Sequence, residues 1–122
     1  MARAGLLSVT RDENPTARES RLRNLIASGL SGPSITFELA NALAEQDRWV
    51  EAQQAYFEAS SAEPRNADFA FNLAISLDRL HQPAPAIQHY ERAIALAASG
   101  AATFDPQVAR QRVADLRSAL QR

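Results

Sequence analysis

The sequence predicts an all-α protein made of antiparallel helix pairs that stack one on the next. The main observation is internal repetition, because the segment 34–64 recurs 34 residues later in one ungapped frame. Eight residue identities support this frame: Phe37/Phe71, Leu39/Leu73, Ala40/Ala74, Leu43/Leu77, Ala52/Ala86, Gln54/Gln88, Tyr56/Tyr90 and Ala59/Ala93. A period of this length is typical of units that stack, since one helix pair cannot bury both of its faces.

The composition also favours helices packed closely together. Hydrophobic residues make up 46% of the 122-residue chain, and many of them are alanine, the best intrinsic helix former. The chain contains four glycines and few runs of β-branched residues, which argues against a sheet. Its length suits one compact domain or a short solenoid.

Charge and residue types bound the possible functions. The net charge is -1, so no strong field draws nucleic acid or an anionic membrane to the protein. Cysteine is absent, which excludes disulfides, thiol catalysis and thiolate metal sites. No stretch approaches the roughly 20 apolar residues of a membrane span, so we expect no direct membrane insertion by this segment. The compartment stays open.

Residues 1–32 are interpreted as a degenerate N-terminal helix pair. The residues that the frame places in its first helix are Gly5, Leu6 and Val9. We expect this helix to begin at or before Met1. Because a solenoid normally begins with a polar cap and this start is apolar, we expect the chain to be the C-terminal piece of a longer protein.

The second helix of that pair has clear boundaries. Asn14 is a favourable N-cap and Pro15 a favourable first helical residue. The apolar face carries Leu22, Leu25 and Ile26, and the arginines expected to point mostly outward are Arg18, Arg21 and Arg23. Gly29 is expected to end the helix.

Two regular units follow, at residues 33–66 and 67–100. In the first unit we expect helices at 34–45 and 49–61, and Pro64 ends the second of them because a residue before proline is pushed out of the helical region. In the second unit we expect helices from 67 to 80 and from Pro83 or Pro85 to about residue 97. Residues 101–122 then form a C-terminal capping helix from about 106 to 120, with Asp105 as its N-cap. The face expected to cover the last unit carries Ala109, Val113, Leu116 and Leu120.

These units resemble the tetratricopeptide repeat family. The residues that match its pattern in one unit are Leu39, Ala40, Leu43, Trp49, Ala52, Tyr56, Ala59 and Pro64, and in the next they are Leu73, Ala74, Leu77, Ala86, Tyr90 and Ala93. The resemblance implies a right-handed superhelical solenoid that binds a protein or peptide on its concave face. The departures are Thr36 and Ala70 for the early large residue, Pro83 opposite Trp49, and Ala98 for the terminal proline.

A narrower resemblance concerns the segments ALAEQDRWVEAQQAYFEA and EPRNADFAFNLAISLDRL. They are similar to the C-terminal repeats of bacterial proteins for type IV pilus biogenesis, of the mannose-sensitive haemagglutinin kind. This resemblance implies a scaffold on the cytoplasmic or periplasmic side of a bacterial envelope assembly. The alternative is a general adaptor or co-chaperone.

The expected binding surface is formed by the first helix of each unit. The candidate partner-binding residues are Phe37, Asn41, Glu45, Asp68, Phe71, Asn72, Ile75 and Arg79. Phe37 and Phe71 share one repeat position, so we expect them side by side, with Asn41 and Ile75 one turn further along. Aromatic anchors beside amides suit an extended or helical peptide. The alternative is that both phenylalanines are ordinary packing residues.

Other sites are not favoured. The family's carboxylate clamp needs three cations besides two asparagines; Asn41 and Asn72 match the asparagines, but Phe37, Ala102 and Pro106 stand at the cationic positions. The two histidines, His81 and His89, lack a surrounding ligand set, so we expect no metal and no cofactor. The sequence shows no catalytic constellation, so we expect no catalysis. The arginines at 18–23 and 110–117 are interpreted as solvated faces rather than as an RNA-binding surface. Oligomeric state and partner identity stay open.

Overall fold

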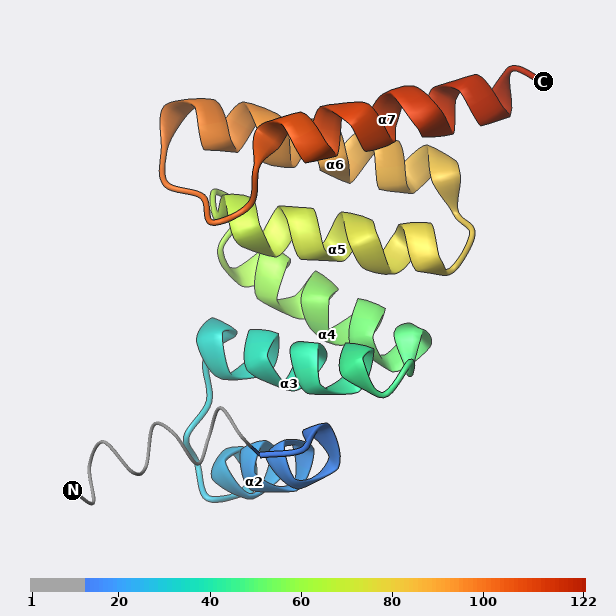
Figure 1. Ribbon diagram of the computed structural model, residues 1–122. Helices are drawn as coiled ribbons and strands as arrows, with labels where there is room; N and C mark the ends of the chain where they lie inside the picture. Colours follow the sequence, from blue (N-terminus) through green and yellow to red (C-terminus); the bar gives the residue numbers. More distant parts are fainter. Residues whose placement is uncertain (1–12) are drawn as a thin grey trace.

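The structure, a computed structural model, describes residues 13–122. The helix expected at or before Met1, with Gly5, Leu6 and Val9, lies outside the described residues. Every regular element from residue 13 onward is a helix. The helices are α2 (Pro15–Ala27), α3 (Pro33–Glu45), α4 (Trp49–Ala62), α5 (Ala67–Arg79), α6 (Pro83–Ser99) and α7 (Pro106–Leu120). They are stacked in chain order from α2 at one end to α7 at the other, and each packs against the next (Figure 1).

Polar caps and prolines set the helix starts. The carboxamide or carboxylate oxygens of Asn14, Asn66 and Asp105 accept hydrogen bonds from the first-turn amides of α2, α5 and α7 at 2.8, 3.0 and 2.9 Å. These bonds satisfy donors that have no partner within the helix. The expected caps Asn14 and Asp105 are therefore confirmed. Some expected ends are one or two residues off, since α3 begins at Pro33 and α6 continues to Ser99.

The turns within the two regular units have the same geometry. Asp47 and His81, which lie 34 residues apart, both have a φ of 60°. After each of them, the next backbone N–H donates back to the carbonyl of Leu43 or Leu77, at 3.0 and 2.9 Å. This is the Schellman arrangement, in which a left-handed residue ends the helix and satisfies its last carbonyls. Repetition in sequence is thus matched by repetition in backbone conformation.

Replacing Asp47 by glycine should stabilise the protein. A left-handed conformation costs a residue with a Cβ about 1 kcal/mol, and Asp47 is exposed, so Asp47→Gly should raise the free energy of unfolding by up to that amount in urea titrations. The reverse change, Gly29→Ala, should lower the free energy of unfolding, because Gly29 has a φ of 99°. A new Cβ would meet no atom within 4 Å, so a steric clash would add nothing to this backbone cost. Equal stabilities of the two variants would contradict the backbone argument.

The repeat positions also share their environments. In seven of the eight matched pairs both residues are buried or partly buried, and the remaining pair, Gln54 and Gln88, is exposed at both places. Ala40, Ala74, Ala52 and Ala86 are all 0% exposed, so these alanines are fully enclosed by the packed helices. The core therefore runs as a continuous strip through the stack, as expected for helix pairs that bury their faces against each other.

The last helix differs in one respect from the expectation. Ala109, Val113 and Leu116 are buried as predicted, but Leu120 is 53% exposed. The reason is visible in Figure 1, where the final turn of α7 continues past the ends of α5 and α6. This turn has no neighbouring helix to cover it.

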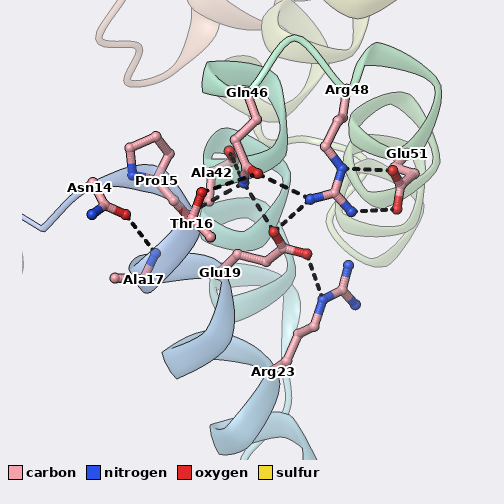
Figure 2. Close-up of polar contacts among 10 residues, drawn as sticks. All are labelled: Asn14, Pro15, Thr16, Ala17, Glu19, Arg23, Ala42, Gln46, Arg48 and Glu51. Atoms are coloured by element: carbon pink, nitrogen blue, oxygen red, sulfur yellow. Dashed lines mark hydrogen bonds and ion pairs between the residues drawn. The ribbon is translucent and has the colours of Figure 1, made fainter.

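A polar cluster attaches α2 to the turn between α3 and α4 (Figure 2). One oxygen of Glu19 accepts hydrogen bonds from the Gln46 amide at 3.0 Å and from Arg48 at 2.7 Å, and its other oxygen accepts from Arg23 at 2.9 Å. Arg48 also forms a bidentate ion pair with Glu51, at 2.8 and 2.9 Å. The bonds of Gln46, then those of Arg23 and Arg48, outweigh desolvation and lower the pKa of Glu19 from 4.5 to about 2.

This cluster predicts an acid-sensitive contribution to stability. Because the folded-state pKa of Glu19 is depressed, its contribution is present above pH 4.5 and is lost as the pH falls toward about 2. Glu19→Gln should cost about 1 kcal/mol at neutral pH, the scale of surface ion pairs. Melting curves between neutral pH and pH 2 should show the wild type and the variant converging in acid. A difference that is constant across this range would contradict the assignment.

Candidate functional site

A groove of about 920 Å³ lies between α5 and α7 and is the candidate site. We call it the α5–α7 groove. Its lining residues are Trp49, Phe71, Ile75, Asp78, Arg79, His81, Pro83, Tyr90, Val108, Ala109, Arg112, Leu116, Ala119 and Leu120. They come from α4, α5, α6, α7 and the turn between α5 and α6, so this groove forms only when these elements are packed together.

The two long walls of the groove are mostly apolar. Phe71 and Ile75 of α5 are partly buried, whereas Val108 and Leu120 of α7 are 59% and 53% exposed. When a partner covers large aliphatic side chains with this exposure, the free energy falls by roughly 25 cal/mol for each Å² of apolar surface that is buried. The walls are therefore suited to an apolar ligand surface.

The polar groups of the groove interact mainly with one another. Asp78 accepts a hydrogen bond from the Tyr90 hydroxyl at 2.9 Å and a bidentate pair from the Arg112 guanidinium at 2.7 and 2.8 Å. The hydrogen bond from Arg112, assisted by that from Tyr90, lowers the pKa of Asp78. Burial raises the pKa of Tyr90, and Asp78 adds to this effect. This cluster joins α5, α6 and α7. Asp78 and Arg112 are both ionised at physiological pH, so their charges cancel each other.

Arg79 is the exception among these polar groups. Its guanidinium carbon lies 5.3 Å from the ring centroid of Trp49, a cation–π contact that holds the side chain at the groove. Arg79 is exposed. Among residues 13–122 it has no carboxylate within ion-pair distance.

Three of the eight sequence-predicted site residues line this groove: Phe71, Ile75 and Arg79. Phe37 and Phe71, which were expected to lie side by side, each stack on a different ring. Phe37 stacks on Phe69 with ring centroids 4.6 Å apart, and Phe71 stacks on Phe104 at 4.2 Å with nearly parallel rings. Each phenylalanine therefore stacks on a ring of the segment that follows its unit, and both pack against the buried core.

The other five predicted residues lie outside the groove lining, and the polar ones among them are already bonded. Asn41 accepts the Tyr56 hydroxyl at 2.6 Å, and Asn72 donates to the carbonyl of Asp68 at 2.9 Å. Asp68 also accepts the amide and the hydroxyl of Thr103 through its carboxylate, at 2.8 and 2.9 Å. Glu45 pairs with Arg18 at 2.6 Å. The two asparagines are thus committed inside the protein.

Sequence reasoning missed the α7 wall and Trp49. Val108 lies outside the buried stripe of α7. An apolar residue on the outer side of a capping helix could have indicated that this side also contacts a partner. Arg112 of α7 pairs with Asp78 of α5, so α7 contacts α5 directly as well as α6.

The arginines interpreted as solvated faces are largely paired with acids. Arg18, Arg21, Arg23, Arg112 and Arg117 form ion pairs with Glu45, Glu13, Glu19, Asp78 and Glu91. The side chain of Arg18 is only 11% exposed, because it packs between α2 and α3 instead of pointing outward. Much of the positive charge is therefore compensated within the protein.

No group of three or more histidine, aspartate or glutamate residues that could hold a metal ion occurs within residues 13–122. His81 is exposed in its turn, whereas His89 is half-buried and its Nδ1 has no hydrogen-bond partner in that part of the chain. Burial, and then Arg92, lower the pKa of His89. In the same range, no helix has the length and apolar character needed to span a membrane.

No family model and no curated protein matches this chain. The tetratricopeptide assignment and the narrower pilus assignment therefore rest on the residues quoted above and stay predictions.

Proposed function

We propose that this chain is a protein-binding module that holds a partner in the α5–α7 groove. The observation that carries the proposal is the exposure of Val108 and Leu120, at 59% and 53%, along one wall of a groove of about 920 Å³. An apolar surface that is hollow and rimmed by polar groups is typical of an interaction site. Partner binding would cover these side chains.

We further propose that the fold is a right-handed tetratricopeptide solenoid. Its support is the recurrence, 34 residues apart, of the buried alanines and tyrosines and of the left-handed turn residues Asp47 and His81. In such a solenoid α3, α5 and α7 would be the first helices of successive units. The α5–α7 groove would then be a segment of the inner surface, shifted toward the C-terminus from the surface expected around Phe37.

Two cellular settings are consistent with this proposal. A module of this kind would act as a scaffold within a bacterial pilus or secretion assembly, or as a general adaptor that uses the same groove. Neighbouring genes for pilins and an assembly ATPase would favour the first setting, and neighbouring chaperone genes would favour the second.

Two exposed pairs of apolar residues allow a matched test. Val108→Glu with Leu120→Glu places charges in the groove, and Val50→Glu with Phe57→Glu makes the same change on α4, where the two residues are 59% and 54% exposed and do not line the groove. All four positions are exposed, so both double variants should fold like the wild type. We expect affinity capture to recover a set of partners with the wild type and the α4 variant, and the groove variant to bind these partners at least about tenfold more weakly.

Loss of the partners with the α4 variant and retention with the groove variant would move the binding surface to α4. Identical capture by all three proteins would overturn the proposal. Circular dichroism and urea titrations of each variant would confirm that the fold is intact.

A further inference from the structure

The walls of the α5–α7 groove repeat at helical spacing. Residues 71, 75 and 78–79 follow one stripe of α5, and residues 108, 112, 116 and 119–120 follow one stripe of α7. The α7 stripe is about 18 Å long, given a rise of roughly 1.5 Å per residue. Residues 108, 112, 116 and 120 are four positions apart, so their side chains recur about every 6 Å along α7. In an extended chain, side chains on one face recur about every 6.6–6.8 Å, so over three such intervals they drift about 2 Å out of step with this wall.

The hydrogen bonding in the groove also favours a helical ligand over an extended peptide. An extended peptide brings backbone N–H and C=O groups that lose free energy when buried without partners. The groove's strongest polar groups, Asp78 and Arg112, are bonded to each other, and Tyr90 donates to Asp78. The amides of Asn41 and Asn72 are bonded elsewhere. A helix satisfies its own backbone and needs none of these groups.

The charge of the groove is asymmetric. Asp78 and Arg112 neutralise each other, which leaves the guanidinium of Arg79 as an uncompensated positive charge beside apolar walls. Trp49 holds that guanidinium in place at 5.3 Å, so a carboxylate can pair with it without first ordering a mobile side chain. A partner lysine or arginine at the same place would be repelled.

We propose that the occupant of the α5–α7 groove is an amphipathic helix of a partner protein, with a carboxylate opposite Arg79. The helix presents an apolar stripe at positions i, i+3 or i+4, i+7 and i+11 to Ile75, Val108 and Leu120. About three turns suffice to span the α7 wall. This inference rests on the proposed function and specifies the chemistry of its partner.

The probe is a display library of helical peptides of about 16 residues, with one face and its flanking positions randomised. The bait is the 122-residue chain, and the Val108→Glu, Leu120→Glu variant serves for counter-selection. We expect the retained peptides to share an apolar stripe and an aspartate or glutamate at a fixed offset from it. A proline in the middle of such a peptide should abolish binding.

Charge exchange then tests the carboxylate. Arg79→Glu should weaken the selected peptide about tenfold, and a peptide with lysine in place of its acid should bind this variant better than it binds the wild type. Arg110→Glu is the matched control, because Arg110 is also exposed but lies outside the groove and bonds to Gln107 at 2.8 Å. Its affinity for the peptide should equal that of the wild type.

Three results would count against the proposal in distinguishable ways. Peptides with an apolar stripe but no preferred acid, or with unchanged affinity for Arg79→Glu, would overturn the charge assignment and leave the groove's function standing. Tolerance of the central proline would overturn the helical occupant alone. A library that shows no preference for the wild type over the groove variant would overturn both this inference and the proposed function.

Discussion

Leu73→Ala is expected to lower the free energy of unfolding by about 2–5 kcal/mol, the largest change among the substitutions considered for stability. Leu73 is 1% exposed and belongs to the core that runs through the stack. The substitution removes apolar contacts and leaves a cavity that close-packed neighbours cannot fill. Urea unfolding followed by circular dichroism would measure the loss.

The same substitution at an exposed leucine provides the control. Leu120 is 53% exposed, so Leu120→Ala should change the free energy of unfolding by no more than about 0.5 kcal/mol. If the two variants unfold at the same urea concentration, Leu73 does not have the central place in the core that the structure gives it.

Ala74→Leu should destabilise the protein by about 1–3 kcal/mol for the opposite reason, because it adds volume where there is none. Ala74 is 0% exposed, and its counterpart Ala40, at the same repeat position, is also 0% exposed. Ala40→Leu should therefore have a similar cost. Thermal scans of both variants would test whether these alanines lie where helices approach most closely.

Ala114 is the control for this pair of substitutions. It lies within α7 and is exposed, so the larger side chain of Ala114→Leu extends into solvent. This variant should have a free energy of unfolding within about 0.5 kcal/mol of the wild type. Wild-type melting of Ala74→Leu would show that the repeat register assigned to the helix faces is incorrect.

Most of the helical architecture could be predicted from the residues alone. The 34-residue frame identified buried positions such as Leu39, Leu73, Tyr56 and Tyr90, because burial in a stack of similar units recurs at the same interval as the sequence. Helix starts were predictable at Asn14 and Asp105, since capping depends on bonds between a side chain and the backbone two or three residues later. These are local properties.

The candidate site was predictable only in part. Phe71, Ile75 and Arg79 were identified because their places in α5 follow from the helical period. The stacking of Phe37 on Phe69 could not be predicted, because it depends on the rotation and separation of α3 and α5. The hydrogen bond that Asn41 accepts could not be predicted either, because its donor is the hydroxyl of Tyr56 on the opposite helix of the same pair. A single-helix pattern holds no information about either contact.

The sequence by itself determined the helices, their turns and the buried face of each repeat, because these depend on local bonding and on a fixed hydrophobic period. The tertiary structure decided where the groove of the proposed binding site lies. The groove arises because Phe104 stacks on Phe71 and Thr103 bonds to Asp68, at 4.2 and 2.8 Å respectively, which places α7 beside α5 although α6 separates them in the chain. Such contacts between α5 and the segment that leads into α7 depend on packing geometry, and that geometry left Val108 and Leu120 exposed.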